Sequence, residues 1–517
     1  MRILVIGAGH NGLIAATVLA RKGLEVTLLE EKLEVGGAVK TEYLFKNAPR
    51  LGSSSGSYLL GLMPPEIIQM MGVNLPTIRR DPHYFLPCLD GRYLLFGSDK
   101  VKMKEQFIQF FSEADWNANE AMAKEITDLR DDLAPSWLVE PLPMESTAER
   151  YIRPHLRRIF MNLVTQPVEN YLQRFGFKSE LLIAMYAVTD GFSGLTGSFG
   201  TPGTGMNFLV HNMCRLPGSD GTFMMVKGGM GTIAGEFARC AKEAGAKILT
   251  GTGVEKILTQ GNRTTGVLLH NGQELKADVV LCNADPFRLR EMVGSDVLPH
   301  DFNVRLDGMK RYGTTLKINF AMDRLPVFKC LPENKGQHNA TIHLLPSDSN
   351  RYPRLLENIR DGFDEVQQGR LPKFPTIEWY IHTQADPTLQ DAQSHHNGAF
   401  FVQWVPYELQ GTTWEKEEEN YVKHLFSIAE QFAPGFSSSI IDYVTFTPKK
   451  IEEHFGIRYG HIHHIDNTFG FDKRMPYATP IEGLYSCSAG CHPAGSVIGA
   501  AGYNSARRIL NDLNILT

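Results

Sequence analysis

The sequence lacks the features of an exported, disulfide-bonded or membrane-spanning protein. Its 517 residues include only seven cysteines, an odd number without a repeated spacing, and the first is Cys88. Such a set argues against a disulfide framework and for a reducing compartment. The longest apolar runs, such as residues 181–188, are too short to cross a bilayer, and a strand-like stretch starts at residue 2, leaving no room for a signal peptide. We therefore expect a cytoplasmic protein.

Strong charge and low-complexity sequence are also missing. A net charge of −5 and a pI near 6.4 leave no basic footprint for nucleic acid. With 43% hydrophobic and 21% charged residues, the composition is that of an ordinary globular protein. The length is sufficient for two domains, each with a sizeable core.

A dinucleotide-binding pattern opens the chain. The apolar run of residues 3–6 predicts a buried parallel strand, and it ends directly in G-x-G-x-x-G at Gly7, Gly9 and Gly12. In such a motif the first glycine permits a tight turn, the second lets the backbone approach a pyrophosphate, and the third lets the next helix pack on the strand. The N-terminal end of that helix carries a partial positive charge that favours phosphate.

The following residues favour FAD over the other dinucleotides. A second predicted strand, residues 26–29, ends at Glu30, whose carboxylate suits a free ribose diol and so FAD or NAD(H) rather than NADP(H). The glycine pair Gly36 and Gly37, followed by Thr41, resembles the extended FAD fingerprint of the amine oxidase and carotenoid desaturase superfamily. We predict FAD.

A second α/β block spans residues 222–285. It contains Lys227-Gly-Gly-Met-Gly231, a predicted helix over 232–244, and predicted strands at 247–250, 254–258 and 279–285, the last two separated by a hairpin. Gly229 and Gly231 could belong to a nicotinamide fingerprint, but no acid ends the 247–250 strand. We therefore expect NADH and NADPH not to reduce the flavin.

A glycine-rich segment ends the chain. A predicted strand over 484–487 leads into a loop and a helix from about Val497, whose N-terminal end could face the N1 and O2 side of a flavin. Small residues there would let a flat ligand lie on the backbone: Ala494, Gly495, Gly499 and Gly502. The close pair Cys487 and Cys491 lies in this loop, and we interpret it as two small packed residues rather than a redox or metal pair.

The rest of the chain divides into helical and mixed segments. Residues 100–190 show helical spacing, and residues 191–205, rich in Gly, Ser and Thr, predict a loop near a ligand or hinge. Residues 305–450 return to mixed strand and helix, including predicted strands at 315–321 and 400–405. This part is the expected second domain.

Three segments together resemble one family: the G-x-G-x-x-G start with its glycine pair, residues 227–285, and His492-Pro-Ala-Gly495 through Gly502. They look like the bacterial-type phytoene desaturase family of FAD enzymes. Short segments at 36–42, 57–60, 317–319 and 460–464 are most similar to a less understood branch of that family.

The resemblance implies an α/β fold with a discontinuous, Rossmann-like FAD-binding domain and an inserted α+β substrate domain. The FAD domain would comprise residues 1–95, 220–300 and 455–517, and the substrate domain 96–219 and 301–454. The implied FAD-binding residues are Gly7, Gly9, Gly12, Glu30, Gly36, Gly37, Val254, Gly490, Gly495, Ser496, Val497 and Gly499.

The sequence departs from the family at two places. Ala38 replaces the arginine that usually follows the glycine pair, and Ala494 and Ser496 replace glycines of the flavin loop. These changes bear on carotenoid specificity more than on FAD binding.

The candidates for catalysis are histidines near the flavin loop. If residues 460–466 form a strand, His461 and His463 share one face while His464 shares the other with Asp466, which weakens a three-histidine metal site. We expect no metal and favour His464 for moving a proton, with His492 second; hydrogen-bonded structural histidines are the alternative. Lys317 could support a water near flavin N5, as a lysine does in amine oxidases, or form an ion pair.

Three functions stay open. The first is hydride transfer to flavin N5 from a C–H bond of a large apolar, polyene or lipid-like substrate in a long tunnel, with oxygen or quinone as electron acceptor. The second is an amine oxidase-like reaction in a short aromatic pocket, and the third is structural FAD in an interaction module. An apolar substrate could be collected at a membrane surface through residues 59–72 and 181–188, although such stretches are more often core than membrane contact.

Overall fold

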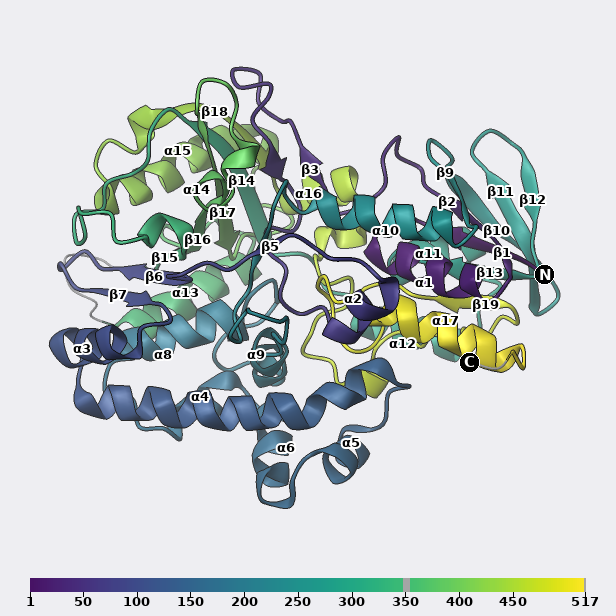
Figure 1. Cartoon of the computed structure of the whole chain (residues 1–517), viewed down its shortest axis with the longest axis horizontal. Helices are drawn as coiled ribbons and strands as arrows, with labels where there is room; N and C mark the ends of the chain where they lie inside the picture. Colours follow the sequence, from purple (N-terminus) through teal and green to yellow (C-terminus); the bar gives the residue numbers. More distant parts are fainter. Residues whose placement is uncertain (347–353, 516–517) are drawn as a thin grey trace.

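The first sheet of the computed structural model is five-stranded and parallel, in the order β19-β13-β1-β2-β9 (Figure 1). The structure describes residues 1–346 and 354–515. The strands are β1 (Arg2–Ile6), β2 (Glu25–Leu29), β9 (Lys247–Leu249), β13 (Val279–Cys282) and β19 (Leu484–Ser486). Strands from the beginning, middle and end of the chain thus form one sheet.

Alternating side chains place this sheet between two layers. Ile3 and Val5 of β1 join the core beneath one layer, whereas Leu4 and Ile6 join the core on the opposite face. The first layer consists of α1 (His10–Arg21), α10 (Gly231–Glu243) and α17 (Ala500–Asp512). The second consists of the antiparallel strands β10 (Val254–Gln260), β11 (Arg263–Leu269) and β12 (Glu274–Lys276) with α11 (Pro286–Val293) and α12 (His300–Met309).

The second sheet has seven strands in the order β18-β14-β17-β16-β15-β6-β7. Its strands are β6 (Tyr84–Pro87), β7 (Tyr93–Phe96), β14 (Thr315–Met322), β15 (Thr341–Leu344), β16 (Thr376–Ile381), β17 (His396–Gln403) and β18 (Ile440–Phe446). Helix α15 (Trp414–Phe432) covers one face with Leu425, Ile428 and neighbouring apolar residues. The other face points into the interior of the molecule, where it bounds the cavity described below.

The predicted domain boundary at residue 95 does not follow this sheet. The hairpin β6–β7 lies within the segment assigned to the FAD domain, yet β6 pairs in parallel with β15 of the second sheet. Residues 84–96 therefore belong structurally to the second half of the molecule. The division into two domains otherwise stays a prediction.

Helices fill the lower part of the second half in the view of Figure 1. The region predicted as helical contains α3 (Lys100–Phe110), α4 (Glu113–Leu133), α5 (Met144–Tyr151), α6 (Arg157–Thr165), α7 (Val168–Gln173) and α8 (Glu180–Tyr186). The remaining elements are α2 (Pro65–Met71), α9 (Thr204–His211), α13 (Leu355–Gln367), α14 (His382–Ala385), α16 (Pro448–Phe455) and the two-stranded pairs β3 (Thr41–Glu42) with β4 (Ser53–Ser54) and β5 (Thr77–Ile78) with β8 (Met225–Val226).

Two expectations near the end of the chain are wrong. Residues 461–466 form consecutive turns rather than a strand, because Tyr459, Gly460 and His464 adopt φ values of about +60°. Helix α17 begins at Ala500, three residues after Val497, since Gly499 takes a left-handed conformation at its N-terminal cap. The flavin loop is correspondingly longer than predicted.

The two apolar stretches proposed for membrane contact are core. Most of the apolar side chains in residues 59–72 and 181–188, including Leu60, Met63 and Leu182, are buried in the largest hydrophobic cluster. In the described part of the chain, no helix combines the length and the apolar composition needed to cross a membrane.

Candidate functional site

A narrow groove runs along the carboxyl ends of β1 and β2. Its volume is about 150 Å³. Six of the predicted FAD-binding residues line it: Gly7, Gly9, Glu30, Gly36, Gly37 and Val254. The groove lies at the edge of the parallel sheet where such folds bind dinucleotides.

The glycine turn fits a pyrophosphate. A Cβ atom at Gly12 would lie 2.2 Å from the carbonyl oxygen of Gly7, so only glycine permits this approach of α1 to the turn. Gly9, at the N-cap of α1, offers no capping side chain, and no acidic residue occupies the first turn. The first N–H groups of α1 are thus left for an anionic ligand.

Glu30 and Val254 fit the adenosine half of FAD. The Glu30 carboxylate is buried and accepts hydrogen bonds from the backbone N–H groups of Ala8 (2.7 Å) and Lys32 (2.9 Å). These two bonds fix its orientation and leave further lone pairs for ribose hydroxyl groups. Val254 adds an apolar surface beside it, at the start of β10.

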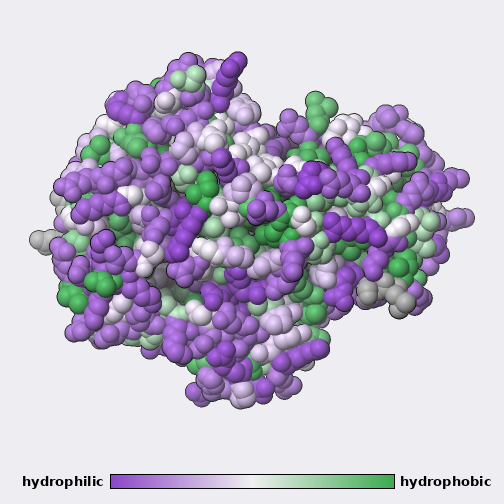
Figure 2. Space-filling model, in the orientation of Figure 1, coloured by the Kyte–Doolittle hydropathy of each residue, from purple (hydrophilic) through white to green (hydrophobic). Residues whose placement is uncertain are grey.

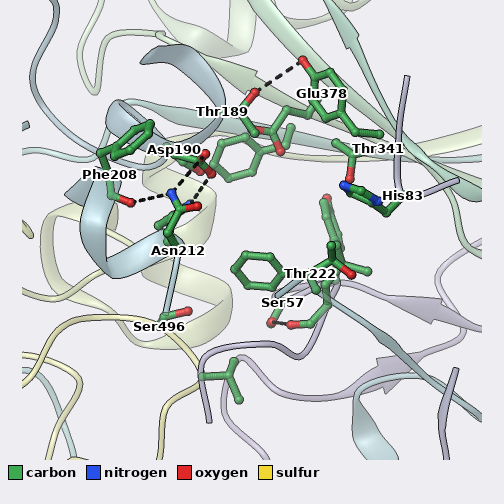
Figure 3. Close-up of a pocket in the computed structure, with 18 of the residues that line it drawn as sticks. Ser57, His83, Thr189, Asp190, Phe208, Asn212, Thr222, Thr341, Glu378 and Ser496 are labelled. Carbon is green, nitrogen blue, oxygen red and sulfur yellow. Dashed lines mark hydrogen bonds and ion pairs between the residues drawn. The ribbon is translucent and has the colours of Figure 1, made fainter. Parts of the chain in front are cut away.

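A second, larger cavity of about 520 Å³ continues from the groove. The two share His10, Ala38, Phe455, Ile457, His464 and Ala489. The cavity extends between the first sheet, the second sheet and helix α4, and its lining includes Ser496 and Val497 (Figure 3). In Figure 2, apolar side chains gather around a hollow between the two halves of the molecule. Part of this volume suits the flavin ring, and the rest suits a substrate.

The remaining predicted flavin-loop glycines lie outside both cavities. A Cβ atom would lie 2.8 Å from Pro286 at Gly490, 2.4 Å from the His463 backbone at Gly495, and 2.7 Å from Ile14 at Gly499. Gly502 similarly lies against the Asn11 carbonyl of α1. These residues shape the flavin loop by close packing, whereas Ser496 and Val497 reach the cavity itself.

The histidine cluster has a different geometry from the predicted strand. The Nε2 atom of His461 lies 3.2 Å from a carboxylate oxygen of Asp466, and the Nε2 atom of His463 lies 3.0 Å from the carbonyl oxygen of Ser193. His464 instead faces the junction of the two cavities. Burial lowers its pKa to about 3, and its Nδ1 atom has no hydrogen-bond partner within the described structure. His464 is therefore a neutral imidazole with a free ring nitrogen.

His492 is placed differently. It lines neither cavity, its Nε2 atom lies 2.9 Å from the carbonyl oxygen of Ser136, and its ring packs on Phe471. This arrangement links the flavin loop to the helical region. We retain His464, and not His492, as the candidate for proton transfer.

Three neighbouring strands of the second sheet bring two charged residues to the cavity. Lys317 of β14 and Glu378 of β16 both pair in register with Phe401 of the intervening strand β17. Residues opposite one another in antiparallel strands share a face, so the three side chains form one row, and all three line the cavity. We call Lys317, Phe401 and Glu378 the charged row.

Burial shifts the pKa values of the charged row toward each other. It lowers the pKa of Lys317 to about 7 and raises that of Glu378 to about 7, in each case opposed by the charge of the other residue. Lys317 donates to the carbonyl oxygen of Gly56 (2.5 Å) and lies 4.0 Å above the ring of Tyr58. Glu378 accepts a hydrogen bond from Tyr380. Within the described residues, Lys317 and Glu378 therefore have separate hydrogen-bond partners and form no direct ion pair with each other.

Asp190 adds a third ionisable group with a shifted pKa. It lies in a π-helical turn, residues Ala187–Gly191, that follows α8, and Figure 3 shows it beside Asn212, which donates to its carboxylate (3.4 Å). Burial raises its pKa to about 7. Such turns interrupt a regular helix and are frequent at functional sites.

Sequence reasoning weighed Lys317 but missed Glu378, Asp190, Tyr58 and Arg80, all of which line the cavity. A signal was available for the row: Lys317 and Glu378 are the charged residues of otherwise apolar or neutral strands. A charge inside such a strand indicates a buried ionisable group. The other three lie in segments without a local pattern.

The glycines considered for a second nucleotide have structural neighbours. A Cβ atom at Gly229 would lie 2.3 Å, and one at Gly231 3.0 Å, from the hydroxyl oxygen of Thr41. Strand β9, which follows α10, pairs with β2 in the first sheet. The predicted block therefore completes one dinucleotide fold. Cys487 and Cys491 are buried free thiols, as interpreted from the sequence.

Comparison with known proteins agrees with this geometry. A family model described as flavin containing amine oxidoreductase matches residues 12–359. Pyridine nucleotide-disulfide oxidoreductase domain-containing protein 2 of Rattus norvegicus is 33% identical, with 99% of this chain and 93% of the relative covered. A zeta-carotene-forming phytoene desaturase of Myxococcus xanthus is 25% identical over 85% of this chain and 79% of its own length.

Solved structures show the same fold at low identity. An oxidoreductase from Methanosarcina mazei has a TM-score of 0.63 at 18% identity, covering 99% of this chain and all of the other. A putrescine oxidase bound to putrescine has a TM-score of 0.59 at 16% identity, with both chains fully covered. The chain belongs to the flavin containing amine oxidoreductase family and is an FAD-dependent oxidoreductase.

Proposed function

We propose that this protein oxidises a C–H bond of a largely apolar substrate that is held in the cavity between the two halves of the molecule. The observation that carries the proposal is the continuity of the dinucleotide groove with this cavity through His464 and Ala489. A flavin whose adenosine half lies at Glu30 would end at the cavity, near Ser496 and Val497. We propose on the same grounds that the residues predicted to bind FAD do so. Gly490, Gly495 and Gly499, which lie outside both cavities, would contribute by shaping the flavin loop.

The chain's own contribution is positioning, exclusion of water and proton transfer. Bound FAD supplies the acceptor of a hydride. Phe401, Phe455 and Val497 provide apolar walls that exclude water from the reacting C–H bond. Since His464 is neutral at pH 7, its free ring nitrogen can accept a proton released from the substrate but cannot donate one.

The names of relatives support a hydrocarbon-like substrate. They include phytoene desaturases and a limonene dehydrogenase polypeptide of Castellaniella defragrans, which is 21% identical over 99% of this chain. We further propose that the chain belongs to the branch of the rat protein above, and that oxygen or quinone accepts its electrons. No docking surface for a membrane is proposed, because most of the apolar side chains in both stretches expected to form one are buried.

An amine substrate is the second candidate, and the putrescine oxidase fold favours it. The aromatic residues Tyr58, Tyr380 and Phe401 line the cavity, as an amine pocket would require. However, the ammonium group of Lys317 already lies over the ring of Tyr58 and 5.0 Å from the ring of Phe401. This side chain occupies the ring faces on which a cationic amine would lie, so we place this function second.

Anaerobic mixing of the holoenzyme with candidate substrates tests the proposal. Phytoene, limonene and putrescine represent the substrate classes, and loss of the oxidised flavin absorbance is the measurement. We expect bleaching by an isoprenoid hydrocarbon and none by putrescine or NADPH. Bleaching by putrescine alone would favour the amine oxidase, and rapid bleaching by NADPH would contradict the single-nucleotide fold.

A further inference from the structure

We propose that Arg80 forms a binding subsite for a carboxylate group on the substrate, so that the substrate is an apolar chain with an acidic end. This inference rests on the proposed function, because it names the substrate class of the same cavity. Its basis is a buried guanidinium group that lines the cavity and has no anionic partner among the described residues.

Arg80 is held by neutral groups only. Its Nη1 atom donates to the hydroxyl oxygen of Thr341 (2.9 Å) and its Nε atom donates to the carbonyl oxygen of Phe223 (3.3 Å). The residue is 5% exposed and lines the cavity. Among residues 1–346 and 354–515, no carboxylate forms an ion pair with it, and no hydrogen bond uses Nη2. One edge of the guanidinium is therefore available.

The charge of Arg80 persists at neutral pH. Burial lowers its pKa only to about 10, so the guanidinium stays protonated. An isolated buried charge is costly, and buried arginines normally have a carboxylate or phosphate partner. The adjacent Arg79 shows the contrast: it is one-third exposed and pairs with Asp220 (2.9 Å) at the surface.

Neighbouring groups do not supply the missing anion. The charge of Glu378 raises the pKa of Arg80, yet this carboxylate accepts the hydrogen bond of Tyr380 and has a pKa of about 7 itself. Burial lowers the pKa of His83 to about 4, so this ring is neutral. A singly charged carboxylate would balance one guanidinium, whereas a doubly charged phosphate would exceed the charge of one guanidinium.

The subsite lies across the cavity from the flavin end. In Figure 3, Thr341, the partner of Arg80, and His83 lie on the wall opposite Ser496. A substrate with its carboxylate at Arg80 would therefore present a more distant carbon to the flavin. This geometry separates the acidic end of the substrate from the C–H bond that is oxidised.

Calorimetric titration of the FAD-loaded protein with decanoate and with 1-decanol tests the subsite. Both probes have the same chain length, and only decanoate carries a negative charge. We expect decanoate to bind at least about tenfold more tightly, because hydrogen bonds to a charged group stabilise more than those to a neutral group. Arg80→Gln should reduce decanoate affinity by about 10- to 100-fold and leave decanol affinity within about twofold.

Two further variants control for folding and for general charge effects. Arg80→Lys keeps the charge and should retain most of the preference for decanoate. Arg215→Gln, at a partly exposed arginine that pairs with Glu66 outside the cavity, should leave both affinities unchanged. Equal binding of the two probes, absence of decanoate binding at millimolar concentration, or full decanoate affinity in Arg80→Gln would overturn the subsite. Because the titration involves no turnover, a flavin that no hydrocarbon reduces would overturn the proposed function and leave this result intact.

Discussion

The dinucleotide groove and the larger cavity are adjoining but are built in opposite ways. The groove is formed mainly by backbone: its glycines permit close approaches, and Glu30 supplies the fixed carboxylate beside Val254. The cavity is formed by side chains from the second sheet, the helical region and the flavin loop, and it contains ionisable groups with shifted pKa values. Because backbone atoms form the groove, its shape suits one kind of ligand. Because side chains form the cavity, single substitutions can change it while the cofactor stays bound.

The largest effect should come from filling the groove. A valine at Gly9 would introduce a side chain whose Cβ lies 3.0 Å from Asn283 and would occupy the path of the pyrophosphate. We expect FAD content of Gly9→Val to fall at least about tenfold, measured as flavin released on denaturation. Gly235→Val, on an exposed turn of α10 with free space around it, is the control. Normal FAD content in Gly9→Val would show that the groove does not hold the pyrophosphate.

The next largest effect should distinguish His464 from His492 by their influence on the rate of flavin reduction. We expect His464→Ala to keep its FAD but to lower the rate of flavin reduction by an isoprenoid substrate about 10²-fold, as is typical for loss of a general base. His492→Gln, outside both cavities, should reduce the rate little per bound flavin. The measurement is anaerobic stopped-flow absorbance. An unchanged rate in His464→Ala would show that His464, like His492, has a structural role only.

A smaller effect concerns the pH dependence of the charged row. Lys317 loses its proton near pH 7, so a neutral amine is available only above that pH. We expect the rate of flavin reduction to rise about tenfold between pH 6 and 8 and Lys317→Met to lose this step. Glu378→Gln removes a negative charge that raises the pKa of Lys317, so the step should move to lower pH. If the rate rises at the same pH in Glu378→Gln as in the wild type, Glu378 does not influence the pKa of Lys317.

The smallest effect should appear in stability. Folding raises the pKa of Glu378 from 4.5 to about 7, so between these values the folded state binds more protons than the unfolded state. Stability from this residue is full below pH 4.5 and is lost as the pH rises through 7. Relative to Glu378→Gln, we expect the Tm of the wild type to fall by on the order of 2 °C between pH 5 and 8. Calorimetry that shows parallel Tm curves would contradict the buried pKa.

The groove could be predicted from sequence because its residues are close to local motifs. Gly7, Gly9 and Gly12 belong to one turn, and Glu30 follows the next strand, so spacing alone carried the prediction. The cavity could not be predicted in this way. Glu378 and Lys317 meet only through the register of β14, β17 and β16, and Arg80 reaches its place through Thr341, which lies 261 residues away in the chain.

The wrong predictions share a physical cause. An alternating pattern over residues 460–466 suggested a strand, but left-handed φ values at Gly460 and His464 turn the chain twice within that segment. Polar side chains then bond to distant partners, such as Ser193, instead of following a strand face. The hairpin β6–β7 was assigned to the wrong half because nothing in its own residues specifies the strand beside which it pairs.

The order of strands in the first sheet has a consequence for biosynthesis. Strand β1 precedes its partner β13 by 276 positions, from Ile3 to Val279, and β19 follows β13 later in the sequence. Until then the nascent chain exposes an unpaired, apolar strand edge, which is prone to aggregation. The first sheet therefore stays incomplete until residues from the beginning, middle and end of the sequence are all present, and its unpaired edge is exposed for that time.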